Sequence, residues 1–94
     1  MSTSPHTPEP TADDYRHAVA AQLRADRKRT QLLIEDLADD TGLSKSSVMS
    51  YLNAKRDMPM KALVKICASL GVRPETVFAK ARASVHAEFE RRAA

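Results

Sequence analysis

A short segment near the middle of the chain carries the side chains with the clearest chemical potential. It places four of them at helical spacing on one face: Ser46, Met49, Ser50 and Asn53. All four are uncharged, whereas a helix face that only needs to stay solvated normally carries Glu, Lys and Arg. Ser and Asn donate and accept hydrogen bonds, and Lys45, in the first turn, would reach a guanine edge or a phosphate. The pattern indicates a helix whose surface approaches base edges closely.

The flanking sequence would hold this helix in place. Residues 34–41 carry apolar side chains at spacings of three, four and seven, with acidic residues opposite, which predicts a short amphipathic helix. Gly42 follows as a left-handed helix cap, and Leu43 would anchor the turn in the core. Ser44 is expected to cap the next helix, which ends near Asn53. The buried side of that helix is expected to consist of Val48, Tyr51 and Leu52.

The whole stretch resembles the helix-turn-helix of the Cro and phage-repressor family. Five positions match the family pattern, namely the small residue of the first helix, the turn glycine, the turn hydrophobe and two core positions: Ala38, Gly42, Leu43, Val48 and Tyr51. The resemblance implies an all-α, five-helix, lambda-repressor-like DNA-binding domain. It places the base-reading positions at Ser44, Lys45, Ser46, Met49 and Ser50, and a phosphate contact at Asn53.

Two positions depart from the family pattern. Relatives often begin the first helix of the motif with a Ser cap and a phosphate-binding Gln, where this chain has Leu33 and Ile34. Many relatives place a Glu late in the second helix, paired with an Arg of helix one, and here that position is Leu52. The side chains for those two contacts are therefore missing.

Two basic stretches flank the motif. The first begins at Arg24 near the expected end of helix one, where cations stabilise the helix by themselves; phosphate contact is the alternative. The second lies in the loop after the reading helix, where a backbone phosphate would pass if that helix entered the major groove. The predicted phosphate-binding residues are Arg27, Lys28, Arg29, Asn53, Lys55 and Arg56.

The chain divides into three parts. Residues 1–11 are rich in proline and hydroxyl side chains and have no aliphatic residue beyond the initial Met, which predicts a disordered tail. Residues 12–80 are predicted to form the helix-turn-helix domain, starting with a capping box at Thr11. A fifth helix can begin at Pro74, and residues 81–94 would extend it as a C-terminal helix.

The fifth helix carries a narrow apolar stripe: Phe78, Ala81, Val85 and Phe89. Val85 and Phe89 lie beyond the expected body of the domain, so their apolar surface needs a partner. One interpretation is the same helix of a second chain, which would make a homodimer. The other is that the helix folds back on its own domain.

Composition narrows the class of protein. The formal charge is +3, but Met1 to Asp14 hold three acidic and no basic side chains, which leaves 15 basic and 9 acidic ones from Tyr15 onward. A basic domain is consistent with nucleic-acid binding. Cys67 is the only cysteine, no apolar run approaches the roughly 18 residues needed to span a bilayer, and no signal peptide is visible. A reducing cytoplasm is the expected location, with no membrane partner.

Catalysis is not expected. No group of His, Cys, Asp or Glu has the spacing of a metal site, and with only two glycines the chain forms neither a P-loop nor a dinucleotide turn. The sequence therefore predicts no catalytic residue, no metal, no cofactor and no small-molecule ligand.

The function expected from the sequence is that of a sequence-specific regulator that binds a double-stranded DNA operator. A small repressor or Cro-like protein acting by operator occupancy is the simplest form, placed in the bacterial cytoplasm or nucleoid, or in the host cell if phage-encoded. The alternative is a protein-binding adaptor or antitoxin-like module, favoured by the acidic face of residues 34–41 and the missing Gln.

Overall fold

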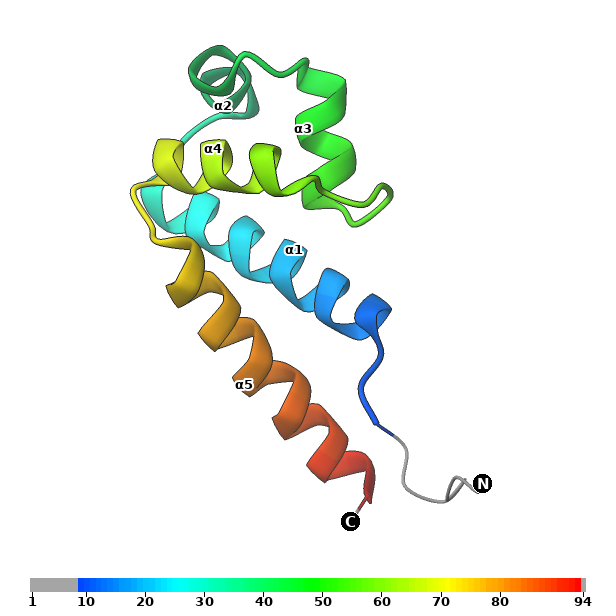
Figure 1. Cartoon of the computed structure of the whole chain (residues 1–94). Coiled ribbons are helices and arrows are strands. Elements are labelled where there is room, and N and C mark those ends of the chain that lie inside the picture. The colour runs from blue at the N-terminus through cyan, green and yellow to red at the C-terminus, as the bar shows by residue number, and fades with distance from the viewer. Residues whose placement is uncertain (1–8, 94) are drawn as a thin grey trace.

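The computed structural model describes residues 9–93, and these residues form five α-helices and no strand. The helices are α1 (Ala12–Thr30), α2 (Ile34–Thr41), α3 (Lys45–Leu52), α4 (Met60–Leu70) and α5 (Pro74–Ala93). Figure 1 shows α2, α3 and α4 gathered on one side of α1, while α5 lies on the other side. The predicted all-α, five-helix fold with a long C-terminal helix is confirmed.

Helix α1 begins with the predicted capping box. The Thr11 hydroxyl accepts from the Asp14 amide at 3.1 Å, and the Asp14 carboxylate accepts from the Thr11 amide at 2.8 Å. These two bonds pair amides that a helix N-terminus otherwise leaves without a partner. Thr11 is thus an ordered cap, although we placed it in the tail; residues 1–8 of that predicted tail lie outside the described residues.

The turn between α2 and α3 follows from three local features. Gly42 takes the left-handed conformation (φ 75°), which a residue without a Cβ adopts at little cost, and its amide donates to the Ala38 carbonyl. The buried Thr41 hydroxyl donates to the Leu37 carbonyl at 2.6 Å. The Ser44 hydroxyl then accepts from the Ser47 amide at 3.0 Å and starts α3.

The core lies between α1 and the four later helices. Its largest fully buried side chains come from every helix: Leu23, Leu37, Val48, Ile66, Cys67 and Val77. Burial also raises the pKa of the Cys67 thiol, which keeps this residue a neutral apolar group. Met60 and Val64 of α4, and Phe78 of α5, are more exposed than their apolar spacing predicts.

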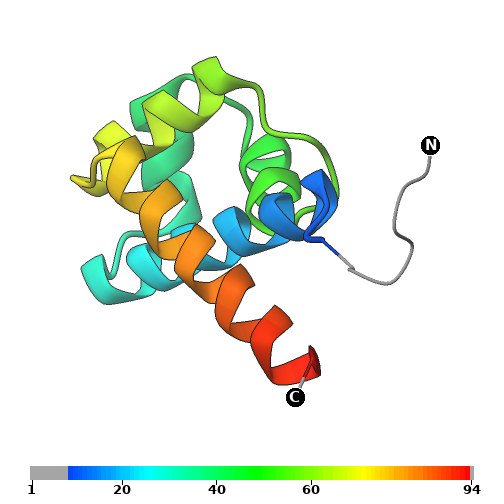
Figure 2. The ribbon, with the colours of Figure 1, turned by 60° about the horizontal axis from the view of Figure 1, so that its bottom comes forward.

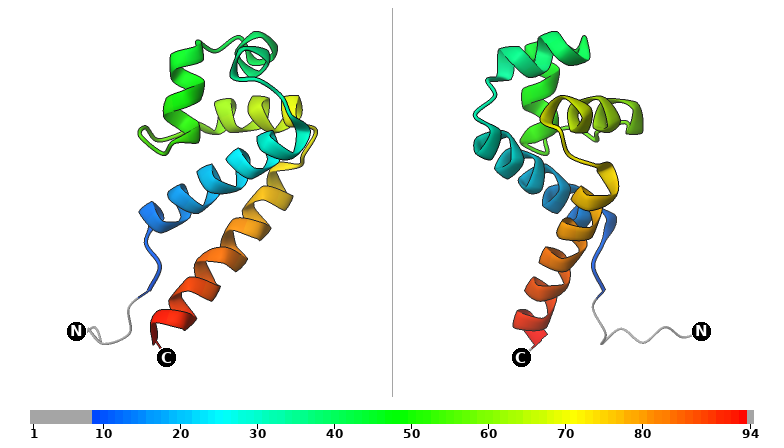
Figure 3. Two further views of the ribbon diagram at one scale, coloured as in Figure 1. Left: turned by 180° about the vertical axis from the view of Figure 1, so that it is seen from behind. Right: turned by 90° about the vertical axis from the view of Figure 1, so that its left-hand side faces the viewer.

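Helix α5 packs along α1 of the same chain. Figure 2 shows α5 crossing α1 obliquely, and Figure 3 shows α3 on the other side of α1 from α5. Val85 is only 6% exposed, and the Tyr15 hydroxyl lies 3.1 Å from Nε2 of His86. The expectation that Val85 lies beyond the body of the domain is therefore wrong, because α1 is long enough to cover it. Phe89 is partly buried at the same contact.

None of the helices described here is both long enough and apolar enough to cross a membrane.

The packing of α5 on α1 gives a prediction. Val85→Ala should lower the free energy of unfolding by about 2 kcal/mol, because it removes two buried methyl groups and leaves a small cavity. Ser84→Ala, at an exposed position of the same helix, should stay within about 0.5 kcal/mol. Chemical denaturation of both variants at low and high protein concentration measures this. If Val85→Ala lowers the free energy of unfolding only at high protein concentration, the residue is instead buried between two chains.

Candidate nucleic-acid interface

The face of α3 that points away from the core carries the predicted base-reading residues. Ser46 and Met49 are exposed, Met49 to 44%, and Ser50 is half-buried. The opposite side of α3 is held by Val48, Tyr51 and Leu52, all at most 6% exposed. The helix is therefore fixed in rotation, with its small uncharged side chains toward solvent.

Ser44 differs from the other predicted base-reading residues. Its hydroxyl caps α3 and also donates to the hydroxyl of Ser47 at 2.9 Å. Both of its hydrogen-bonding roles are thus used within the turn. These contacts position the start of α3, and base reading by Ser44 stays a prediction.

Lys45 is paired with an acidic residue that the sequence analysis did not single out. Its Nζ donates to Oε2 of Glu35, near the N-terminus of α2, at 2.9 Å. This hydrogen bond from Lys45 lowers the pKa of the Glu35 carboxyl. The two residues are separated by the whole turn, and a local periodicity does not reveal such a pair.

The loop after α3 is shaped by Arg56. Its guanidinium lies over the Tyr51 ring, 4.9 Å from the centroid, and donates to the Tyr51 hydroxyl at 3.2 Å and to the Ser47 hydroxyl at 3.3 Å. The side chain is still exposed, so it folds back on α3 without being removed from solvent. Asn53 and Lys55 are exposed on either side of Ala54, which has a positive φ of 58°.

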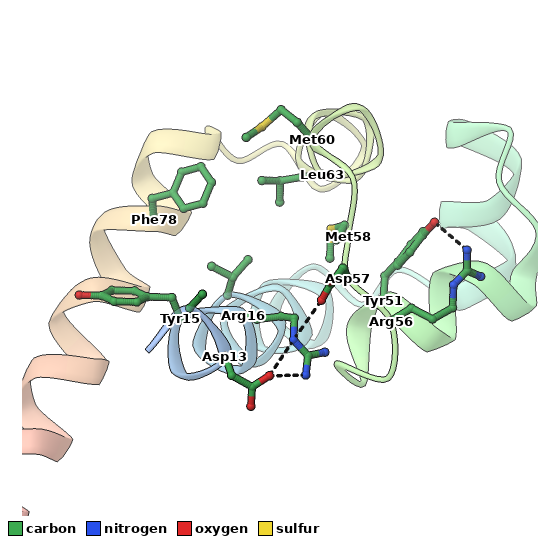
Figure 4. A pocket seen from close by; sticks show the side chains of 12 residues that line it. Asp13, Tyr15, Arg16, Tyr51, Arg56, Asp57, Met58, Met60, Leu63 and Phe78 are labelled. Carbon is green, nitrogen blue, oxygen red and sulfur yellow. Dashed lines mark hydrogen bonds and ion pairs between the residues drawn. The ribbon is translucent and has the colours of Figure 1, made fainter. Parts of the chain in front are cut away.

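Arg16 of α1 also holds the loop after α3 in place, a role that the sequence did not predict. It donates to the Ala54 carbonyl and reaches Asp57 with Nε at 3.3 Å, and Nη2 pairs with Asp13 at 2.6 Å. Figure 4 shows Arg16 between these two carboxylates. Its hydrogen bonds lower the pKa of Asp13. Only the pairing with Asp13, three residues away on the same helix, follows from the sequence.

The basic residues near the C-terminal end of α1 are of two kinds, those that bind backbone carbonyls and those that remain exposed. Arg24 donates to the Leu52 carbonyl at 2.5 Å, and Arg27 donates to the Leu32 carbonyl at 2.8 Å. Arg27 is half-buried and this contact fixes the linker before α2, so the structure favours a supporting role for it over the predicted phosphate contact. Lys28 and Arg29 remain exposed, although Arg29 also pairs with the buried Asp26 at 3.1 Å.

Arg24 also accounts for a departure from the family pattern. Leu52 stands where relatives have a Glu for an arginine of helix one, and here the arginine binds the backbone carbonyl of Leu52 instead. The cross-link between α1 and the end of α3 is thus made without a carboxylate.

Across residues 9–93, no three His, Cys, Asp or Glu side chains are grouped so that they could hold a metal ion. The polar groups of this face are hydroxyls, an amide and cations, with the Glu35 carboxylate beside Lys45. The hydroxyls, the amide and the cations suit hydrogen bonding to base edges and phosphates.

The fold and this exposed helix face define a helix-turn-helix DNA-binding protein. The chain matches the model of the Cro/C1-type helix-turn-helix DNA-binding domain over residues 22–79, more than half of its length, and it belongs to that family. That family is one of DNA-binding domains. No curated protein matches the sequence.

Solved structures share the same fold. A crystal structure of the clp gene regulator ClgR from Corynebacterium glutamicum superposes with a TM-score of 0.78 at 22% identity, over 90% of this chain and 87% of that chain. A second crystal structure of that regulator gives a TM-score of 0.70 at 24% identity, over 81% of this chain and 95% of that chain.

The two kinds of basic residue give a prediction. Arg27→Gln should lower the free energy of unfolding by about 1 to 3 kcal/mol, because the Leu32 carbonyl loses its charged donor in a half-buried place. Lys28→Gln, its exposed neighbour, should change it by less than about 0.5 kcal/mol. Thermal unfolding measures both. Unchanged stability of Arg27→Gln combined with weaker DNA binding would restore the phosphate role.

Proposed function

We propose that this protein is a sequence-specific transcription regulator that binds a double-stranded DNA operator with α3 in the major groove. The observation that carries the proposal is the exposed face of α3, where small uncharged side chains stand on a helix fixed by its buried side. Lys45, Ser46, Met49 and Ser50 read base edges, Met49 through a thymine methyl group.

Phosphate contacts fix the orientation of α3. Asn53, Lys55 and Arg56 hold the strand that passes the C-terminal end of α3, and Lys28 and Arg29 are the exposed cations at the end of α1. Arg56 reaches the backbone while it stacks on Tyr51, so its orientation is set before DNA arrives. Such contacts give affinity without sequence preference.

Repression by operator occupancy, as in a Cro-like protein, is the form of regulation that we propose. A bound domain of this kind covers a promoter without needing a further activity. The place of action is then the DNA of a bacterial cell, in the cytoplasm or nucleoid, with a phage as one source. The clp gene regulator shares this fold, which is compatible with a regulatory role.

Homodimerisation through α5 is a second part of the proposal. Because Val85 is buried against α1, a second chain would contact the opposite side of α5, which exposes Ala79, Ala83 and Ala87. Small side chains allow two helices to approach closely, and readers of this class commonly bind as two-fold dimers.

A protein-binding adaptor is the second candidate. It is favoured by an open groove of about 690 Å³ between α1, α5 and the loop before α4, lined by apolar side chains that include Phe78 and Met60 (Figure 4). The two candidates share Arg56, which lines the groove, but the exposed side chains of α3 that would read bases do not line it.

Selection of bound duplexes from a random DNA pool at moderate salt tests the proposal. An enriched inverted repeat, with half-sites about one helical turn apart, is expected for a dimeric reader. A single enriched half-site would retain DNA reading and remove the dimer. Salt-sensitive binding without enrichment would refute the sequence-specific function and favour the adaptor.

The base-reading face gives a prediction about preference. Ser46→Ala and Ser50→Ala should each change base preference at one position of the enriched site by about 1 kcal/mol, with an upper limit of about 3 kcal/mol. Binding to a panel of single-base variants of the site measures this. Ser69→Ala, on α4, should leave the whole panel unchanged. If all three variants give the wild-type preference, the assigned face is wrong.

The loop cations give a prediction about salt. Lys55→Gln should weaken binding to all duplexes alike and reduce the slope of log K against log salt by about one. Lys80→Gln, an equally exposed lysine on α5, is the matched control and should keep the wild-type slope. Titrations over a range of salt concentrations measure both slopes. A loss confined to one DNA sequence would assign Lys55 to a base instead.

A further inference from the structure

Glu35 places a carboxylate at the DNA-facing corner of the motif. It lies in the first turn of α2, and Lys45 is the first residue of α3, so their contact at 2.9 Å joins the beginnings of the two helices. Both side chains remain more than half exposed, Glu35 to 60% and Lys45 to 55%. Within residues 9–93, Glu35 is the only acidic side chain that forms an ion pair with Lys45.

The neighbouring residues at this corner provide few hydrogen-bond donors for a phosphate. Leu33 and Ile34 carry no side-chain donor, and the Leu33 amide is taken by the carboxylate of Asp36 at 2.9 Å. Helix α2 thus begins with two carboxylates, and Asp36 is used as a cap. Glu35 and the lysine that it contacts are the charged side chains left exposed at this corner.

The other acidic residues of α2 do not reach α3. Asp40 accepts from the Ser69 hydroxyl at 2.7 Å, on the side of α4. Asp39 is exposed and forms no ion pair among the described residues. The contact with the reading helix is therefore particular to Glu35, and Asp39 offers the same charge without it.

The pair has different consequences for phosphates and for base edges. A phosphate that binds Lys45 brings a second negative group beside the carboxylate, so it must displace Glu35 or accept its repulsion. A guanine edge presents neutral acceptors, and a lysine ammonium has three donors. With one donor on Glu35, two donors are left for base acceptors.

We propose that Glu35 is a specificity-determining residue of the DNA interface, which holds Lys45 toward base edges and suppresses its binding to phosphates. This inference rests on the proposed function, since it concerns the same face of α3. Its consequence is that unrelated DNA binds more weakly than the number of cations on the domain would give.

Glu35→Gln removes the charge and keeps the size of the side chain. In this variant Lys45 is free to contact a phosphate, so the salt slope on an unrelated duplex should become steeper by about 0.9. Between 50 and 200 mM salt, this corresponds to an additional loss of affinity of about 3.5-fold. At low salt the variant should bind unrelated DNA more tightly, and the ratio of specific to non-specific affinity should fall.

Two further variants distinguish an effect of the Glu35–Lys45 contact from an effect of the change in net charge. Asp39→Asn makes the same change of charge on the same helix without touching Lys45, and it should leave the slope as in the wild type. In a Lys45→Met background, Glu35→Gln should no longer steepen the slope. Thermal unfolding of each variant verifies that the domain is folded in the titrations.

The measurement is binding of the enriched duplex and of one unrelated duplex, each over a range of salt concentrations. Equal slopes for Glu35→Gln and Asp39→Asn would overturn the inference, because a general charge effect would explain both. A steeper slope that persists with Lys45→Met would overturn it too. If the wild type enriches no sequence, the proposed specific function fails, while the slopes on unrelated DNA still decide whether Glu35 restrains Lys45. If the wild type binds no DNA, both fail.

Discussion

The rest of the structure depends on the burial of one side of α3. This helix has eight residues, and a helix of that length is not stable alone in water. Val48, Tyr51 and Leu52 supply the stability by packing into the core, and Ser44 supplies the cap. The opposite side therefore does not need residues with high helix propensity or paired charges. Its small polar side chains are permitted because the helix is held from behind.

Arginines of α1 complete this support through backbone carbonyls. Arg24 binds the last residue of α3 and Arg27 binds the linker before α2, so both ends of the motif are tied to one helix. A guanidinium carries several donors in a fixed plane, and its charge strengthens each bond to a carbonyl. Some of the basic side chains near the motif thus bind groups inside the domain. The total of 15 basic side chains therefore overstates the number of cations that remain for DNA.

The sequence predicts most of the local structure and little of the long-range pairing. The caps at Thr11, Gly42 and Ser44, and the start of α5 at Pro74, depend on neighbouring residues and are readable from spacing. The fold-back of Val85 onto α1 depends on how two distant helices cross, which periodicity does not encode.

The candidate site follows the same division between local and long-range information. The exposed face of α3 is predictable, since it is the complement of the buried face. The partners of its cations are less so, because they come from other elements. Glu35 lies ten residues before Lys45, and Arg16 lies 38 residues before Ala54. Neither separation corresponds to a helical repeat, so only the packed structure brings these groups together.

One turn of α1 joins the C-terminal helix to the loop after α3. Tyr15 reaches His86 of α5, and the adjacent Arg16 reaches Ala54 and Asp57 in the loop after α3. Figure 4 shows these two side chains leaving α1 toward opposite elements. The position of the loop thus depends on a part of α1 that α5 holds in place. A change at α5 can therefore alter DNA binding through the loop, even though α5 and α3 lie on opposite sides of α1.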